Sequence, residues 1–184
     1  FANNDKKQIR TYMKMSFNFT FFLSFPIMFG IISISKAFVP VFFGAGYEKV
    51  STIIYILSPM VLLMGLANVL GTQYLLPLKK QKEYTFSVTI GTIVNFVLNY
   101  ILITLYQSIG AAIATVLSQI VVDILQYNHV KREISVKQLI RLCWRYVFAS
   151  LIMFMLCCIV KGILNIDAIT QVIYNSAANM NLNK

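Results

Sequence analysis

The sequence predicts an all-α protein, a polytopic bundle of about five transmembrane helices. Its 184 residues are 58% hydrophobic and only 12% charged, whereas soluble domains contain roughly 45–50% apolar residues. The mean hydropathy is +0.73, and the charges fall in a few short blocks between long apolar runs. Because about 20 apolar residues cross a hydrocarbon core roughly 30 Å thick, lipid is the predicted environment of these runs.

Five apolar runs have the length of a membrane span. They cover about residues 17–35, 53–76, 86–106, 109–128 and 144–164. Each run is predicted to be helical, because an unpaired backbone amide in hydrocarbon costs several kcal/mol and because the runs are too long for barrel strands. Pro26 and Pro59 lie inside the first two runs and are predicted to kink those helices.

The segments outside the five runs are short. Residues 1–16 are expected to be cytoplasmic, and five crossings would leave the tail of residues 165–184 extracytoplasmic. Residues 37–46 are apolar but too short to cross, so we expect an interfacial loop or short surface helix that is either a plain linker or a gate. The chain begins with Phe1 and not Met, so we expect it to continue a longer polypeptide.

Lysine and arginine are distributed unevenly among the connections. Twelve of the sixteen lie in alternate segments, at residues 1–16, 79–82 and 131–145, whereas the intervening connections hold only Lys36 and Lys49. The positive-inside rule then predicts a multi-pass protein with a cytoplasmic amino end. The net charge of +10 does not indicate a nucleic-acid partner, because the basic residues form no stripe with interleaved aromatic residues.

Cysteine and histidine show no metal-binding pattern. Cys143, Cys157 and Cys158 lie in or beside one apolar run without a C-x-x-C motif, and His129 is the single histidine. One histidine cannot complete a metal site by itself. We therefore expect no metal, no cofactor and no catalytic residues.

Polar residues recur at helical spacing inside the predicted spans. Asp123 is the only acidic residue within a span and lies four residues after Gln119, which places both on one helical face. An acidic group in a membrane is expensive, so it is a candidate for a functional role. The full set of candidates for a cavity wall or substrate path is Asn68, Thr72, Gln73, Thr92, Asn95, Asn99, Gln119 and Asp123.

Two interpretations of these polar residues remain open. Amides and hydroxyls both donate and accept hydrogen bonds, which suits the hydroxyls of a sugar. The same groups also hold transmembrane helices together, at about 0.6 to 2 kcal/mol each. For Asp123, an ion pair with Lys131 or Arg132 is the alternative to a coupling or relay role.

The basic residues of the predicted cytoplasmic connections have two interpretations as well. They bind a diphosphate or anionic lipid headgroups, or they only fix the topology. The residues concerned are Lys79, Lys80, Lys82, Arg132, Arg141 and Arg145.

Three blocks of sequence resemble the later helices of polysaccharide repeat-unit flippases, of the O-antigen and capsule type. The blocks are FFGAGYE at 42–48, LSPMVLLMGLANVLGTQYLLPLKKQKEYT at 57–85 and IGAAIATVLSQIVV at 109–122. These flippases belong to the multidrug, oligosaccharidyl-lipid and polysaccharide exporter superfamily. The resemblance covers about residues 11–154 and is specific because the three blocks occur in the order and at the spacing of the family.

The resemblance implies an exporter fold of twelve to fourteen helices in two lobes around a central cavity. It implies that this chain is the carboxy-terminal portion, matching helices nine to thirteen, and that an amino-terminal lobe of the same transporter completes the cavity. The implied substrate is an oligosaccharide on a polyprenyl diphosphate, flipped across the cytoplasmic membrane for surface polysaccharide assembly, with membrane lipids and polysaccharide assembly proteins as further partners. The chain departs from the family at Gln119, where members often have Glu, and in the tail, where no fourteenth helix is visible.

Two other functions remain as alternatives. A cation-coupled multidrug exporter of the same superfamily needs acidic or aromatic groups in its cavity. A polyprenol-dependent membrane glycosyltransferase or polymerase needs acid and base groups at the membrane surface, where the predicted outer loops supply only Glu48.

Overall fold

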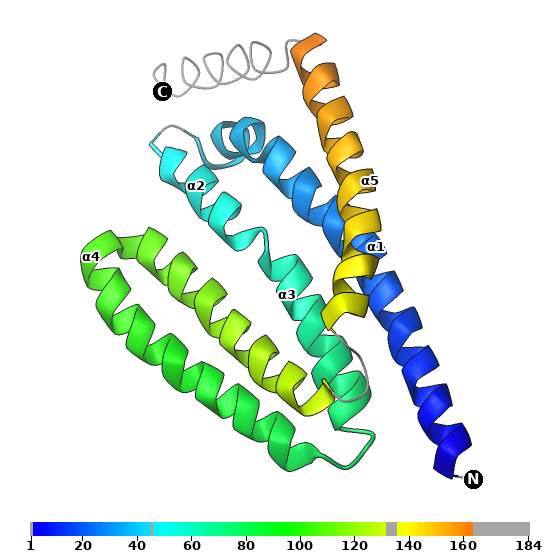
Figure 1. Ribbon diagram of the computed structural model, residues 1–184. Coiled ribbons are helices and arrows are strands. Elements are labelled where there is room, and N and C mark those ends of the chain that lie inside the picture. Colours follow the sequence, from blue (N-terminus) through cyan, green and yellow to red (C-terminus); the bar gives the residue numbers. More distant parts are fainter. Residues whose placement is uncertain (1, 45, 132–135, 164–184) are drawn as a thin grey trace, which may run out of the picture.

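The computed structural model describes residues 2–44, 46–131 and 136–163, and within them every long element is a helix (Figure 1). The elements are α1 Ala2–Phe43, α2 Glu48–Leu57, α3 Met60–Ala67, η1 Asn68–Leu75, α4 Gln81–Val130 and α5 Val136–Ile163. The predicted tail of residues 165–184 lies outside the described residues. The prediction of an all-α protein with long apolar helices is confirmed.

Helix α1 is longer than the first apolar run at both ends. It begins at Ala2, inside the segment expected to be cytoplasmic, and it continues through Pro26 and Pro40 to Phe43. Residues 37–43 are therefore neither a loop nor a separate short helix but the last turns of α1, because a helix satisfies its own backbone hydrogen bonds in an apolar environment. The chain leaves the helix at Gly44 and Gly46, whose φ values of 82° and 88° suit glycine best.

An aromatic stripe on α1 forms much of the packed core. Phe17, Phe21 and Phe25 recur every fourth residue and are nearly fully buried, and successive ring centroids lie 6.0 and 5.9 Å apart. Rings at this spacing lie on one face of a helix. The stripe packs with residues of η1 and with Val130 at the end of α4.

The second apolar run is divided into three helical pieces. Helix α2 ends at Leu57 and α3 begins at Met60, so the predicted kink at Pro59 is a break between two helices. Helix η1 then follows as a π-helix, in which the Leu76 amide donates to the Gly71 carbonyl at 3.1 Å. The sequence did not predict this wider helix.

Helix α4 is a hairpin of two antiparallel arms, which Figure 1 shows in green. The reversal occurs at Gln107, which has a φ of 53° and a ψ of −128°. The third and fourth apolar runs fall on the two arms, which we name the first arm (residues 81–106) and the second arm (residues 108–130). Helices α1, α4 and α5 and the α2–α3–η1 segment are each long and apolar enough to cross a membrane.

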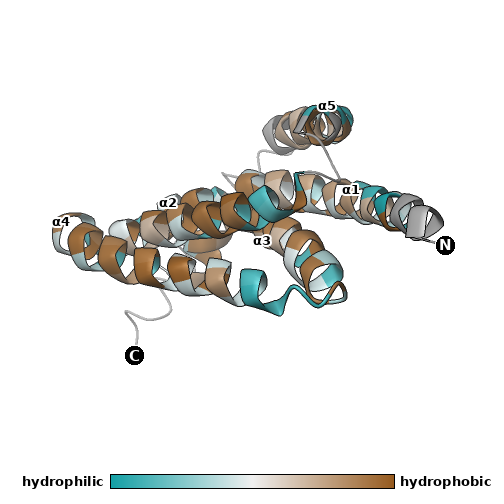
Figure 2. Cartoon of the chain, turned by 60° about the horizontal axis from the view of Figure 1, so that its bottom comes forward, coloured by the Kyte–Doolittle hydropathy of each residue, from teal (hydrophilic) through white to brown (hydrophobic). Residues whose placement is uncertain are grey.

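Apolar side chains cover much of the outer surface. On the first arm, Phe96 and Tyr100 are 75% and 77% exposed, whereas Asn95 is only partly exposed. Figure 2 shows apolar segments along α2, α3 and α4 and hydrophilic ones at the connection before α4. Such an apolar exterior is stable in lipid and unstable in water, so the chain is a multi-pass membrane protein.

Candidate functional site

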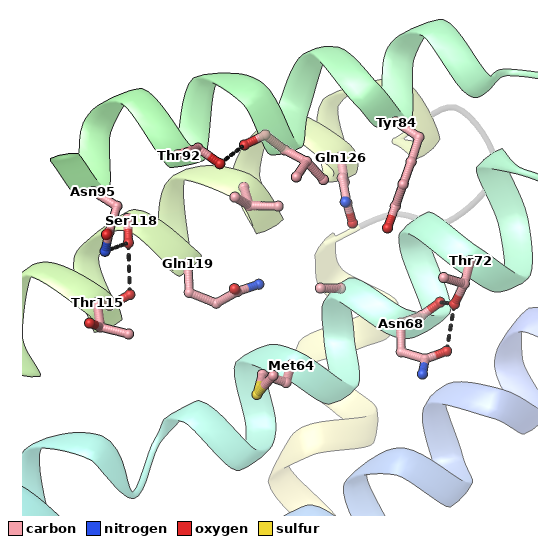
Figure 3. Close-up of a pocket in the computed structure, with 14 residues that line it drawn as sticks. Met64, Asn68, Thr72, Tyr84, Thr92, Asn95, Thr115, Ser118, Gln119 and Gln126 are labelled. Carbon is pink, nitrogen blue, oxygen red and sulfur yellow. Dashed lines mark hydrogen bonds between the residues drawn. The ribbon is translucent and has the colours of Figure 1, made fainter.

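A polar cavity of about 420 Å³ lies between α3, η1 and the two arms of α4. Figure 3 shows Thr92 and Asn95 on the first arm, Gln119 on the second arm, and Asn68 on η1 around this space. The lining residues are Met64, Ala67, Asn68, Thr72, Tyr84, Val88, Gly91, Thr92, Asn95, Thr115, Ser118, Gln119, Val122 and Gln126. None of these lining residues carries a charge.

Each arm of α4 contributes one helical face to the cavity. On the first arm the lining positions are 84, 88, 91, 92 and 95, and on the second arm they are 115, 118, 119, 122 and 126. Spacings of three, four and seven residues keep side chains on the same face of a helix. The polar side chains of the inward faces are Thr92 and Asn95 on the first arm and Thr115, Ser118, Gln119 and Gln126 on the second, with Val88, Gly91 and Val122 between them.

The π-helix η1 joins three polar side chains, of which Asn68 and Thr72 line the cavity and Gln73 does not. The Thr72 hydroxyl donates to Asn68 Oδ1 at 2.6 Å, and Gln73 Nε2 donates to the same oxygen at 3.4 Å. An α-helix brings residues three and four apart together, whereas the wider turn of a π-helix also brings together residues five apart. The π-helix therefore lets Asn68 contact both partners.

Asn95 connects the two arms. Its Nδ2 donates to Ser118 Oγ at 2.9 Å, and its Oδ1 accepts from Asn99 Nδ2 at 2.8 Å. Ser118 Oγ in turn donates to the Thr115 carbonyl at 2.9 Å. Asn95 thus both lines the cavity and joins the helices, so the two interpretations of the polar stripe apply to the same residue.

Glycines allow the walls to approach closely. A Cβ at Gly91 would overlap the side chain of Val122 on the opposite arm. A Cβ at Gly71 would lie 2.7 Å from the Tyr84 ring and 3.1 Å from Gln126 Nε2. Gly71 therefore brings η1 against both arms of α4, where Tyr84 and Gln126 form one end of the cavity.

The structure separates the eight candidate residues into two groups. Five of them line the cavity: Asn68, Thr72, Thr92, Asn95 and Gln119. The other three lie outside the lining. The side chain of Gln73 donates a hydrogen bond to Asn68, and that of Asn99 donates one to Asn95. Asp123 is 8% exposed and accepts a hydrogen bond from Gln119 Nε2 at 3.3 Å. No ion pair joins Asp123 to Lys131 in the described part of the chain, and Arg132 lies outside it. That the five lining residues contact a substrate stays a prediction.

Sequence reasoning missed Met64, Tyr84, Ser118 and Gln126 as lining residues. The spacing of Ser118 and Gln126 relative to Gln119 was visible in the sequence, since 118, 119, 122 and 126 follow the pattern of a single helical face. Tyr84 and Met64 had no such signal. Tyr84 lies at the polar start of its helix, and Met64 is an apolar residue within an apolar run.

Lys79, Lys80, Lys82, Arg141 and Arg145 do not line the cavity, and Arg132 lies outside the described residues. Lys79 has a φ of 58° in the turn before α4, and the Lys80 ammonium lies 5.6 Å from the centre of the Tyr74 ring. Lys82, Arg141 and Arg145 are exposed. Among the described residues no three His, Cys, Asp or Glu side chains come together as metal ligands.

We predict that Asn95→Leu will weaken the contact between the two arms by about 1 kcal/mol, the usual worth of an interhelical hydrogen bond in a membrane. The physical reason is that leucine cannot donate to Ser118 Oγ. Thermal unfolding of the purified chain in detergent measures the loss. Thr92→Val is the control, because the Thr92 hydroxyl donates only to the Val88 carbonyl of its own helix. Equal losses in the two variants would contradict the role of Asn95.

The fold and the cavity together define the class: a multi-pass helical membrane protein with a cavity between its helices that is lined by amides and hydroxyls, as in membrane transporters. Residues 1–179 match the family described as "Lipid II flippase MurJ". The chain belongs to this family. This agrees with the resemblance of its sequence blocks to lipid-linked oligosaccharide flippases.

Two similar proteins are informative. The chain is 29% identical over 153 residues to the "Probable low-salt glycan biosynthesis flippase Agl15" of Haloferax volcanii, a match that covers 83% of this chain and 32% of that protein. A solved structure of the lipid II flippase MurJ in an inward closed conformation superimposes with a TM-score of 0.69 at 20% identity, covering 98% of this chain and 41% of that one. The chain thus spans about a third of the length of its curated relative, and the structural likeness establishes the fold.

Proposed function

We propose that this chain is the carboxy-terminal part of a flippase for polyprenyl-diphosphate-linked oligosaccharide repeat units in surface polysaccharide assembly. The observation that carries the proposal is the uncharged polar cavity, lined by the amides of Asn68, Asn95 and Gln119 and by hydroxyls, inside an otherwise apolar bundle. Amide and hydroxyl groups both donate and accept hydrogen bonds, so they match the hydroxyls of a sugar. Membership of the MurJ family supports the same class of substrate.

The basic residues support an orientation with the amino end in the cytoplasm. The amino end of α1 and the connection before α4 lie at the same end of the molecule, the lower end in Figure 1, and α5 starts on that side. These are the segments richest in lysine and arginine, and such segments remain cytoplasmic. We propose the cytoplasmic membrane as the location, with Lys79, Lys80, Lys82, Arg132, Arg141 and Arg145 near diphosphate or lipid headgroups.

An amino-terminal lobe is the proposed main partner. The cavity is open on one side of the described residues, and the chain spans about a third of the length of its curated relative. A second lobe would close the cavity, and rocking of one lobe against the other would give alternating access. Membrane lipids and polysaccharide assembly proteins complete the proposed set of partners.

The cavity favours this function over the two alternatives. A cation-coupled drug exporter would use an acidic group in the wall, yet Asp123 lies behind the lining. A glycosyltransferase or polymerase would use acid and base groups near the substrate, and the described lining contains no acid, lysine or histidine.

The test is lipid flipping in proteoliposomes. We expect the complete transporter, this chain with its amino-terminal lobe, to move a fluorescent polyprenyl-diphosphate oligosaccharide between leaflets, and we expect this chain alone to leave it in place. The reason is that one lobe encloses only part of the cavity. Protection of the probe from a membrane-impermeant quencher is the measurement. A complete transporter that moves a cationic dye but not the lipid-linked sugar would contradict the proposal.

A further inference from the structure

The Gln126 side chain is buried at one end of the polar cavity, and its oxygen has no hydrogen-bond partner among the described residues. Gln126 is 1% exposed and lines the cavity, and its Oε1 is an unpaired buried acceptor. Figure 3 shows this oxygen pointing away from the second arm, into the space between the two arms and η1. An unpaired buried acceptor destabilises a protein, so a bound molecule that donates a hydrogen bond here would remove that penalty.

Tyr84 of the first arm reaches the same end of the cavity. A Cβ at Gly71 would lie 2.7 Å from Tyr84 Cε2 and 3.1 Å from Gln126 Nε2, so both atoms lie close to the same point of η1. The Tyr84 hydroxyl is two bonds beyond Cε2, and Gln126 Oε1 is two bonds from Nε2. Figure 3 shows the two oxygens turned toward the same space. The Tyr84 hydroxyl does not donate to Oε1 directly, because Oε1 has no partner.

A hydroxyl group is the ligand chemistry that fits these two oxygens. It has one donor and two acceptor lone pairs, so it can donate to Gln126 Oε1 and accept from the Tyr84 hydroxyl. An ionised carboxylate or phosphate only accepts, and it would leave Oε1 unpaired. An ammonium group only donates, and it would leave the phenol without an acceptor. The described lining also contains no charge that would pair with either ion.

This end of the cavity is the one nearest the basic connection before α4. The Tyr84 amide donates to the Lys80 carbonyl at 3.2 Å, so Tyr84 lies one helical turn from that connection. Gln119, the other glutamine of the lining, lies about 10.5 Å farther along the second arm. If the basic residues contact the diphosphate, the sugar that reaches Tyr84 and Gln126 is the one joined to the diphosphate.

We propose that Tyr84 and Gln126 form a hydroxyl-binding subsite for the first sugar residue, the one joined to the diphosphate. A hydroxyl of this sugar donates to Gln126 Oε1 and accepts from the Tyr84 hydroxyl. The subsite rests on the proposed function, and it adds that this wall of the cavity recognises the first sugar and not only the diphosphate. Water offers the same donor and acceptors, so a trapped water molecule is the competing occupant.

Binding of polyprenyl-diphosphate glucose to the complete transporter in lipid nanodiscs tests the subsite, with sugar-free polyprenyl diphosphate as the reference ligand. We expect Gln126→Leu and Tyr84→Phe each to weaken binding of the glucose lipid by about five- to ten-fold, the usual effect of one hydrogen bond. Binding of the sugar-free lipid should not change. The double variant should bind about as weakly as Gln126→Leu alone, because both side chains contact one hydroxyl.

The matched control is Asn128→Leu, which removes an exposed amide of the second arm outside the lining. It should bind both lipids like the parent. Tyr84→Phe removes only a hydroxyl and keeps the ring beside Gly71, so it is expected to fold even if Gln126→Leu does not. Weakening of both lipids to the same extent, unchanged binding of the glucose lipid, or fully additive losses in the double variant would overturn the subsite.

Thermal unfolding of the transporter without ligand separates the two possible occupants. If a sugar hydroxyl is the partner, Oε1 is unpaired in the free protein, and Gln126→Leu should unfold at the same temperature as the parent or higher. A lower Tm in Gln126→Leu than in Asn128→Leu would assign Oε1 to a trapped water molecule and overturn the subsite. An unaltered transporter that binds neither lipid would contradict the flippase proposal and the subsite with it, whereas the other failures overturn the subsite alone.

Discussion

Thr92→Phe is expected to reduce flipping of the lipid-linked oligosaccharide by about ten-fold or more in the complete transporter, because a phenyl ring in the wall would occupy the sugar path that alternating access requires. Thr92 faces the cavity of about 420 Å³, and its hydroxyl donates only within its own helix. Replacing it therefore fills space without breaking a contact between helices. The measurement is the flipping rate in proteoliposomes at equal protein content.

Thr89→Phe is the matched control for this substitution. Thr89 lies on the same arm and is exposed, but it does not line the cavity. The same change of side chain there should leave the flipping rate within about two-fold, since an extra ring on an outer face is compatible with lipid. Equal losses in the two variants would mean that the cavity is not the substrate path.

Gly110→Ala is expected to lower the free energy of unfolding by about 2 to 3 kcal/mol, since forced overpacking typically costs about 1–3 kcal/mol. A Cβ at Gly110 would overlap the backbone carbonyl of Leu102 across the α4 hairpin. Backbone cannot rotate away as a side chain can, so the two arms would have to separate. Thermal unfolding of the purified chain in detergent should show a Tm lower by about 5 to 10 °C.

The matched control is Gly30→Ala. Gly30 is also a helical glycine, but a Cβ added there meets no atom within 4 Å. Alanine is favoured over glycine inside a helix by about 1 kcal/mol, so this variant should be as stable as the parent or slightly more stable. If Gly110→Ala unfolds at the same temperature as Gly30→Ala, the close packing of the hairpin does not stabilise the protein.

The sequence predicted the class of the fold because the requirements of a bilayer can be read directly from the order of residues along the chain. Run length and the positions of lysine and arginine are properties of the chain itself. At residues 37–43 the same reasoning left an interfacial loop and a short surface helix open, and the structure instead continues α1 through these residues. The same reasoning missed the π-helix η1, because nothing in the residues Asn68–Leu75 distinguishes a π-helix from an α-helix before packing is known.

For the candidate site, the spacing of polar residues identified those that share one face of a helix. It did not identify which neighbouring helix that face packs against. Asn68, Thr72, Thr92, Asn95 and Gln119 line the cavity, and each of them was marked by helical spacing relative to another polar residue of its own run. Asp123 belongs to the same pattern as Gln119, yet it lies behind the wall. Side chains four residues apart on a helix differ in direction by about 40°. This difference is enough to place Gln119 in the lining and the Asp123 carboxyl behind it.

By itself, then, the sequence determined an all-α membrane protein with polar residues inside its spans and a resemblance to lipid-linked oligosaccharide flippases. Only the tertiary structure decided which of those residues meet. The cavity exists because the α4 hairpin folds back at Gln107 and because Gly71 and Gly91 let η1 and the second arm approach. These contacts join residues far apart along the chain, and they depend on close packing in three dimensions, which periodicity along the chain does not record.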